Sequence, residues 1–472
     1  MSKGKPYVDI RGYNEGVTGS CIRNTIHFAD GTTYRYLVDH GMYQGEGHNR
    51  GIDYNDSVSP NKINAVLLTH PHLDHDGALP IFVKNGYKGK IYMTDAAACV
   101  IDIGFNDSYN IMKKDTKLLK KPPLYSMSDI EQTLRQSEAV KFEQPIPIHD
   151  YITVTFFNNG HLVGSSIILV QIEEPGHEPI NLLYTGDYKP NNVFLDIKPL
   201  PCWVYALPNL TIISEATYGT TNSWEIDYHL DEDIIEACSQ NKTIVLFAFA
   251  QGRYQEMLYR IAKLKDQGRI PENYPVRADG KTGTDYTFRQ ISNSNIIKFK
   301  EGMTHFFPSN LTWVDDKNRP SILQYKGGQI IITTSGMGTN GPARVYAPYY
   351  LKDPYAVLYF PGYLSEGTIG RRLYEADYGE TVTIHGESVV KQAQVFQTFE
   401  CSSHATADEC IEFYSQFSPK SILFIHGALD RKESLEARTQ SELGISKNKT
   451  GILGVGYVYR INSYGIDKKV KK

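Results

Sequence analysis

The six residues 70–75, with the sequence HPHLDH, limit what this chain can be more than any other segment. They hold three histidines and a carboxylate, although the whole chain has only 14 histidines. The segment follows an apolar run that is typical of a buried strand, so these side chains gather in a turn at a strand end. Neutral imidazole and carboxylate are ligands that zinc and similar metals prefer. The pattern predicts a metal site in which His70 and His72 face one ion, and Asp74 and His75 face another about 3.5–4 Å away.

Six residues cannot complete two coordination shells, so further ligands must come from other strand ends. His161 follows a predicted strand and lies in a polar turn. Asp187 follows Gly186, where glycine permits a tight turn. His426 follows a third apolar run and precedes Gly427. Each of them taken alone would more often be a turn or capping residue.

Composition excludes several other classes of protein. The 472 residues suffice for two or three domains, and 49 basic against 53 acidic residues give a net charge of -4. Any anionic ligand must therefore be held by a local patch. The six cysteines form no CxxC pair, so we expect free thiols. Neither a signal peptide nor an apolar run of membrane-spanning length is visible, so we expect a cytoplasmic protein without membrane association.

Short apolar β-branched runs alternate with helical patterns, which is typical of a layered α/β fold. Apolar spacing predicts a helix over residues 253–265. Longer αβ units at about 225–385 indicate a separate parallel-sheet unit. Because about half of the chain separates Asp187 from His426, this unit is inserted between ligands of one site. The lysine-rich tail, residues 468–472, is expected to fray.

The order of these motifs resembles that of the β-CASP nucleases, a group of proteins with the metallo-β-lactamase fold. The resemblance runs from near residue 11 to near residue 430. In chain order, its main elements are Asp39-His40-Gly41, residues 70–75, His161, Asp187, Glu215-Ala216-Thr217-Tyr218-Gly219, His404 and His426-Gly427. The resemblance implies an αββα metallo-β-lactamase sandwich built from residues 1–220 and 389–472. It also implies an α/β β-CASP cap domain inserted at residues 221–388.

The resemblance further implies two zinc ions per chain. Their ligands would be His70, His72 and His161 for one ion, and Asp74, His75 and His426 for the other, with Asp187 bridging both. Two such cations would lower the pKa of a bridging water, so that a hydroxide can attack a phosphodiester, and would neutralise the phosphoryl oxygens.

The resemblance assigns the remaining roles as well. Asp39 would fix the geometry of the ligands, and His404, oriented by Glu215, would protonate the leaving oxygen. Positioning of phosphates would fall to an arginine and to loops at strand-to-helix turns. The residues concerned are Arg253, Ser335, Gly336, Met337, Gly367 and Thr368.

The activity implied is a zinc-dependent ribonuclease that cuts single-stranded RNA endonucleolytically. RNA is favoured because His426 occupies a motif that typically carries valine in the DNA-repair members. The family includes the nuclease subunit of the cleavage and polyadenylation factor. The length of this chain, without an N-terminal KH-like extension, resembles the compact bacterial RNA-processing members. A homodimer is a further expectation from the family.

Three alternatives stay open. The first is a 5′-to-3′ exoribonuclease, because the same centre serves both modes in the family. The second is an RNA-binding scaffold without catalysis, against which the intact set of ligands argues. The third is a small-molecule hydrolase of the wider fold, acting on thioesters or lactams, against which the motifs around Glu215 and His404 argue.

Overall fold

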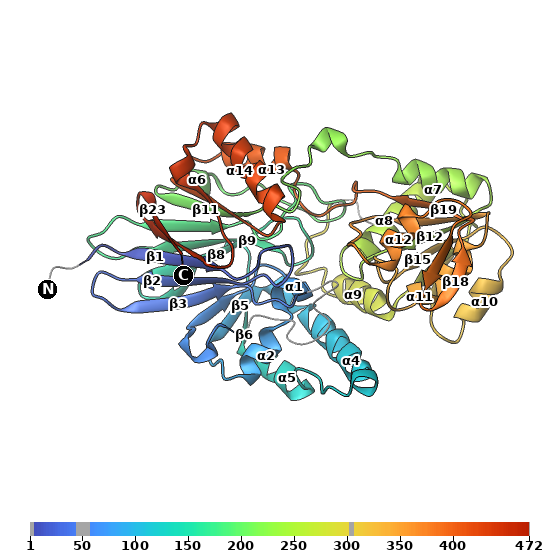
Figure 1. Cartoon of the computed structure of the whole chain (residues 1–472), viewed down its shortest axis with the longest axis horizontal. Helices are drawn as coiled ribbons and strands as arrows, with labels where there is room; N and C mark the ends of the chain where they lie inside the picture. Colours follow the sequence, from blue (N-terminus) through green and yellow to red (C-terminus); the bar gives the residue numbers. More distant parts are fainter. Residues whose placement is uncertain (1–3, 44–56, 302–305, 472) are drawn as a thin grey trace. The chain divides into compact units, whose positions relative to one another are not determined.

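The computed structural model describes residues 4–43, 57–301 and 306–471 (Figure 1). The chain divides into two compact units. The first contains the chain up to Asn192, Ile197–Ser223 and the part from Ser403 onward, and the second contains Val193–Asp196 and Trp224–Ser402. No helix of the described segments is both long and apolar enough to cross a membrane.

The first unit is built on two β-sheets. The eight-stranded sheet contains, in spatial order, β23 (Gly465–Lys471), β22 (Tyr457–Asn462), β1 (Tyr7–Gly12), β2 (Ile22–His27), β3 (Thr33–Val38), β4 (Ala65–Leu67), β5 (Lys90–Thr94) and β6 (Ser137–Val140). The seven-stranded sheet contains β21 (Thr450–Ile452), β20 (Ser421–Ile425), β11 (Leu210–Glu215), β10 (Ile180–Tyr184), β9 (Ser166–Ile172), β8 (Ile152–Asn158) and β7 (Ile146–His149).

The two sheets pack face to face over one hydrophobic core, which includes Val8 and Ile10 of β1 and Leu182 of β10. A second core lies under helices on the outer side of the eight-stranded sheet, and a third lies on the outer side of the other sheet. The helices of the second core are α2 (Leu79–Lys84), α3 (Asp95–Ala98), α4 (Ile101–Leu119) and α5 (Met127–Gln136). Those of the third are α6 (Cys202–Tyr205), α13 (Ala407–Ser415) and α14 (Leu429–Leu443) (Figure 1). This arrangement confirms the predicted αββα sandwich.

The lysine-rich tail does not fray as predicted. It forms most of β23, which pairs antiparallel with β22, and β22 in turn pairs with β1. The backbone hydrogen bonds of this pairing hold the tail in the sheet despite the repulsion between its lysines. Lys469 also lies 4.1 Å from the centre of the Tyr457 ring and 5.3 Å from that of Tyr459, so two aromatic rings stabilise its charge.

The second unit contains a six-stranded parallel sheet. Its spatial order is β14 (Leu311–Val314), β13 (Val276–Asp279), β15 (Ile330–Thr333), β12 (Thr243–Phe247), β16 (Ala356–Phe360) and β19 (Gln394–Gln397). Helices α7 (Leu230–Ser239) and α8 (Arg253–Asp266) pack into a core on one face, and α11 (Ala343–Leu351) and α12 (Ile369–Glu375) into a core on the other. The predicted helix over 253–265 is confirmed. The unit also contains α9 (Lys281–Ser292), α10 (Arg319–Gln324), β17 (Thr381–Ile384) and β18 (Glu387–Val390).

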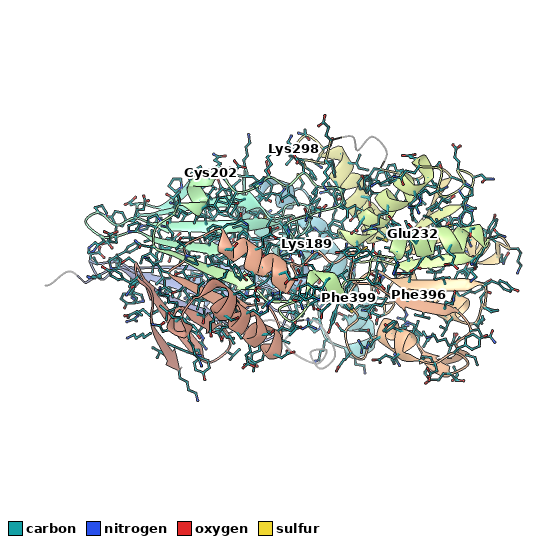
Figure 2. All side chains as sticks on the ribbon, turned by 90° about the horizontal axis from the view of Figure 1, so that it is seen from above. Lys189, Cys202, Glu232, Lys298, Phe396 and Phe399 are labelled. Carbon is teal, nitrogen blue, oxygen red and sulfur yellow. The ribbon has the colours of Figure 1, made fainter. Side chains whose placement is uncertain are left out.

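The chain returns to the first unit at Ser403, later than the boundary of 388/389 placed from the sequence. The reason is β19, which pairs in parallel with β16 and so extends the sheet of the second unit. Phe396 of this strand packs against Tyr359, and both Phe396 and Phe399 have partly exposed side chains (Figure 2).

A chain of three polar side chains crosses the core between the two sheets of the first unit. The hydroxyl of Tyr184 donates to Oδ1 of Asn24 at 2.7 Å and lies 3.1 Å from the hydroxyl of Tyr36. All three side chains are fully or almost fully buried. Burial raises the pKa of Tyr184, so the group is a neutral donor.

We expect Tyr184→Phe to lower the free energy of unfolding by about 1–3 kcal/mol, because Asn24 and Tyr36 would lose their shared buried partner. The matched control is Tyr464→Phe, which alters an exposed ring and should change stability by less than about 0.5 kcal/mol. Urea unfolding followed by near-UV circular dichroism measures both. Equal stability of the two variants would show that these buried hydrogen bonds contribute nothing to the free energy of unfolding.

Candidate metal centre

Six of the predicted site residues lie at or just after the carboxyl ends of strands in the first unit. The pairs are β3 with Asp39, β4 with His70, β8 with His161, β10 with Asp187, β11 with Glu215 and β20 with His426. These strands belong to both sheets of the sandwich. The strand ends therefore bring together side chains that are far apart in the sequence.

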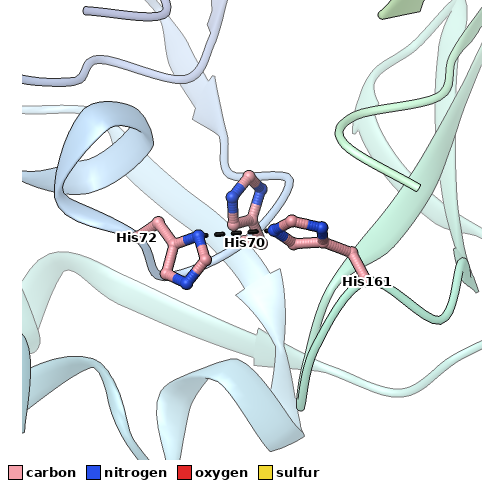
Figure 3. A group of neighbouring side chains, drawn as sticks. All are labelled: His70, His72 and His161. Carbon is pink, nitrogen blue, oxygen red and sulfur yellow. Dashed lines mark hydrogen bonds between the residues drawn. The ribbon is translucent and has the colours of Figure 1, made fainter. Parts of the chain in front are cut away.

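A first group of possible ligands consists of His70, His72 and His161, whose ring nitrogens lie within 4.8 Å of one another. Nε2 of His161 is 3.3 Å from Nδ1 of His72 (Figure 3). The opposite nitrogen of His161, Nδ1, is 2.8 Å from the carbonyl oxygen of Ser403, to which it donates. This bond leaves the lone pair of His161 on Nε2, facing His72.

A second group consists of Asp74, His75 and His426, again within 4.8 Å of one another. Asp74 and His75 belong to the short helix α1 (Leu73–Asp76), which begins directly after His72. Nε2 of His75 and Nε2 of His426 are 3.2 Å apart. Oδ2 of Asp74 lies 3.9 Å from each of these two nitrogens.

Asp187 connects the two groups. Its Oδ2 lies 3.6 Å from Nε2 of His70 and 3.3 Å from Nε2 of His75, and its Oδ1 lies 3.0 Å from Nδ1 of His426. The side-chain amide of Asn159 donates to the carbonyl oxygens of Thr185 and Asp187, at 2.8 and 2.7 Å. Asn159 thereby fixes the turn that carries the carboxylate.

Asp39 sets the orientation of His75. Its Oδ2 accepts a hydrogen bond from Nδ1 of His75 at 2.7 Å and from the hydroxyl of Thr69 at 2.8 Å. Its Oδ1 accepts from the backbone N–H of Thr69 at 2.8 Å. A proton held on Nδ1 puts the lone pair of His75 on Nε2, which faces His426 and Asp187.

Gly41 allows the segment after β3 to lie directly against α1. A Cβ atom at this position would be 1.7 Å from the carbonyl oxygen of Asp74 and 2.6 Å from the backbone nitrogen of His75. The backbone N–H of His40 also donates to the carbonyl oxygen of His75 at 2.8 Å. Any larger residue at position 41 would displace Asp74 and His75 together.

His404 and Glu215 form a pair beside this centre. Nδ1 of His404 donates to Oε2 of Glu215 at 2.9 Å, and Oε1 of Glu215 accepts from the backbone N–H of Tyr188 at 2.6 Å. Burial disfavours the charged form of His404, but the carboxylates of Glu215 and Asp187 outweigh it and raise the pKa of His404. Its side chain is 21% exposed, whereas that of Glu215 is almost fully buried.

The donor set fits divalent cations. Nε2 of His70 is buried and has no hydrogen-bond partner, which is costly unless an ion binds there. The two close nitrogen pairs, at 3.2 and 3.3 Å, match the roughly 3.3 Å between ligands of a tetrahedral zinc ion with Zn–N bonds of about 2.0–2.1 Å. Imidazole and carboxylate donors also suit other borderline metals.

The electrostatics of His70 and His161 agree with this fit. Burial holds the pKa values of His70 and His161 well below the ordinary value, so both are neutral, which is the form that binds metal. Burial also opposes a charge on His75, but the carboxylates of Asp187 and Asp39 outweigh it and raise the pKa of His75 well above its usual range. These two carboxylates favour positive charge at the centre, and a cation that binds there would displace a proton from Nε2 of His75.

The residues predicted to contact phosphates lie in the second unit, in the segments after β12, β15 and β16, with Arg253 as the first residue of α8. These three strands are parallel neighbours, so their carboxyl ends meet at one edge of the sheet. Arg253 is paired with Glu256 in the first turn of α8. A Cβ at Gly336 would lie 2.8 Å from the ring of Phe249, so this loop needs glycine.

The hydroxyl groups of Ser335 and Thr368, which were predicted to contact phosphates, form hydrogen bonds within their own loops. Oγ of Ser335 accepts from the backbone N–H groups of Thr339 and Asn340, both at 3.1 Å. Oγ1 of Thr368 accepts from the N–H of Arg371 at the start of α12 and donates to the carbonyl oxygen of Ser365 at 2.7 Å. Both hydroxyls therefore shape the loops.

Three polar residues of the centre were missed from the sequence. Asn159 and Thr69 are described above, and Thr217 has its hydroxyl 3.1 Å from Nδ1 of His426. In the sequence, only their positions pointed to the site, because each lies within two residues of a predicted site residue.

Three protein-family models match the chain. They are a Metallo-beta-lactamase superfamily domain over residues 29–191, a Beta-Casp domain over 254–373, and a Zn-dependent metallo-hydrolase RNA specificity domain over 388–449. Together they match segments of both compact units.

Three curated relatives illustrate the similarity. Transcription termination factor FttA of Methanosarcina mazei is 30% identical over 82% of this chain, which spans 62% of that relative. Ribonuclease TTHA0252 of Thermus thermophilus is 29% identical, over 83% of this chain and 88% of its own length. The RNase J-like protein of Methanocaldococcus jannaschii is 27% identical, over 85% and 88%. The chain thus spans less than two thirds of the FttA relative but most of the other two.

We expect Asp39→Asn to weaken metal binding by about 10–100-fold, because His75 would lose the carboxylate that orients its ring. Titration of the protein against a chromophoric chelator measures this change. The matched control is Asp30→Asn, in the turn between β2 and β3, which should bind metal as the unmodified chain does. Undiminished affinity of Asp39→Asn would contradict the positioning role.

Proposed function

Because the chain belongs to the β-CASP group of the metallo-β-lactamase superfamily, we propose that it is a zinc-dependent ribonuclease that cuts single-stranded RNA. One observation carries the proposal. Donor atoms from separate strand ends converge on one buried centre, and a histidine–glutamate pair lies beside it. Such a donor set is difficult to explain as packing, since lone pairs would be left buried without partners.

We propose that two zinc ions bind here. The groups that would hold them are His70, His72 and His161 for one, and Asp74, His75 and His426 for the other, with Asp187 shared between them. When bound, the cations lower the pKa of water and stabilise the negative charge that develops on phosphoryl oxygens. Asp39 keeps the His75 ring in the orientation and tautomer that metal binding needs.

His404 is the proposed proton donor to the leaving oxygen. The bond from its Nδ1 to Glu215 fixes the ring and leaves Nε2 as the atom that can reach a substrate. Glu215 is in turn fixed by the N–H of Tyr188. His404 is more exposed than the buried ligands, as a group that contacts substrate must be.

In the second unit, the proposed phosphate contacts are backbone N–H groups. The described residues provide no acceptor for those of Gly336, Met337 and Gly367, which lie in loops at the carboxyl edge of the parallel sheet. Such N–H groups bind phosphate oxygens without regard to base sequence. The guanidinium of Arg253 would contribute only if its pair with Glu256 opened.

RNA is favoured over DNA because His426 stands where the DNA-repair members of the family carry valine, and because the segment around it matches a model described as an RNA specificity domain. We propose endonucleolytic cleavage that leaves a 3′-hydroxyl and a 5′-phosphate. A 5′-to-3′ exonuclease is the alternative that uses the same residues.

We expect the purified protein to cut a circular single-stranded RNA, and a chelator to abolish the activity. Circular RNA has no ends, so its cleavage demonstrates endonuclease action. Cleavage of linear RNA alone would favour the exonuclease. Turnover of a thioester or of DNA, without any chelator-sensitive cleavage of RNA, would overturn the proposal.

We expect His404→Ala to cut RNA about 10²–10⁴-fold more slowly while keeping its metal, because it lacks only the proton donor. Asp187→Ala should lose both metal and activity, because both ligand groups share this carboxylate. The matched control is His229→Ala, which removes an exposed imidazole of the second unit and should cut normally. Normal cleavage by His404→Ala would contradict its role.

Metal analysis gives a separate test. We expect about two zinc ions per chain in active protein. Inductively coupled plasma mass spectrometry of the unmodified chain and of Asp187→Ala measures the content. A stoichiometry near zero in active protein would contradict the two-ion centre.

A further inference from the structure

Three arginines share one face of the eight-stranded sheet. In β1, Val8 and Ile10 point into the core between the sheets, so Arg11 lies on the opposite, outer face. Alternation places Arg23 of β2 and Arg35 of β3 on the same outer face. We call these three side chains the arginine face.

Their arrangement concentrates positive charge. Arg11 and Arg23 are direct cross-strand partners, and Arg35 is paired with Thr25, the next outward residue of β2. Like charges directly opposite each other on a sheet are destabilising. The sheet nevertheless holds these arginines on three consecutive strands, and neighbouring strands lie about 5 Å apart.

Nearby carboxylates do not neutralise this charge. Within residues 4–43, 57–301 and 306–471, no ion pair joins a carboxylate to any of the three arginines. The outward carboxylate of β1, Asp9, is held by Arg460 through two hydrogen bonds of 2.8 and 3.0 Å. His27 lies 3.4 Å from the same carboxylate. Asp9 is therefore already occupied.

An aromatic ring supports two of the guanidinium groups. Arg11 lies 4.6 Å and Arg23 lies 5.7 Å from the centre of the Tyr13 ring, which is buried. Nε of Arg11 is buried without a hydrogen-bond partner. Stacking of this kind limits the freedom of the guanidinium groups before any ligand arrives, which lowers the cost of binding.

Among the described segments, the helices leave this face uncovered. Figure 1 shows β1, β2 and β3 extending away from α2, α4 and α5, which cover the sheet near β5 and β6. All three arginines are partly exposed. Several guanidinium groups in a row on a sheet surface suit an extended polyanion, since each can bind a phosphate with two parallel hydrogen bonds.

We propose that the arginine face binds the phosphate backbone of RNA outside the metal centre, and so adds affinity for long substrates. This inference rests on the proposed ribonuclease function, which supplies the polyanion. The contacts would be independent of base sequence, because they involve only phosphates.

The test uses the full chain with His404→Ala, which should bind RNA without cutting it. Arg11→Gln, Arg23→Gln and Arg35→Gln are combined in this background. Fluorescence anisotropy then measures the affinity for RNAs of about six and about thirty nucleotides over a series of salt concentrations. The matched control removes three exposed lysines of the same unit, Lys88→Gln, Lys141→Gln and Lys198→Gln.

We expect the triple arginine variant to bind the long RNA at least about tenfold more weakly at low salt. The slope of log K against log salt should fall by about 2, because each lost phosphate contact lowers this slope by about 0.7. Affinity for the short RNA, and its cleavage when His404 is restored, should stay unchanged. The lysine control should change neither.

An equal slope in the arginine and lysine variants would overturn the inference, as would an equal loss of affinity for both RNAs. Unchanged RNA binding would instead suit an acidic protein partner and would likewise overturn it. Arg35→Gln alone, which leaves the Tyr13 stack intact, should give about a third of the change in slope even if the triple variant folds poorly. If the unmodified chain cuts no RNA of either length, the proposed ribonuclease function is wrong. This outcome differs from one in which RNA is cut normally and the arginine variants bind it as the unmodified chain does, which would contradict the arginine face alone.

Discussion

The first unit depends on a set of electron-pair donors that its own folding removes from water. Asp187 lies within 3.0–3.6 Å of imidazole nitrogens of His426, His75 and His70, all of them buried. A buried lone pair without a partner, such as that on Nε2 of His70, opposes folding unless something positive binds it. Cations that bind there stabilise the folded chain as well as the site, so folding and metal binding are linked.

The strand ends explain why so much of this centre could be predicted from the sequence. An apolar run followed by a polar turn marks the positions of His70, Asp187 and His426, and a sandwich brings such ends together. The parallel sheet of the second unit was visible for the same reason, since runs such as β12 and β15 are continuous, buried and β-branched.

The residues that hold the ligands in place were much harder to find. Thr217 contacts His426 from more than 200 positions earlier in the chain, and Asn159 holds Asp187 across 28 residues. Hydrogen bonds of this kind leave no periodic pattern. The prediction for the lysine-rich tail was wrong for a related reason. Its charge favoured a disordered end, but its pairing with β22 is a long-range contact that composition does not reveal. The boundary at Ser403 likewise depends on the pairing of β19 with β16.

The order of the strands along the polypeptide has a consequence for synthesis. Strand β20, which carries His426 at its end, pairs in parallel with β11, although nearly all of the second unit, Trp224–Ser402, is translated between them. His404 also follows that unit. The last donor of the centre, His426, is therefore synthesised only after residues 224–402 of the second unit. A nascent chain therefore carries an unfinished centre until both His404 and His426 have been added.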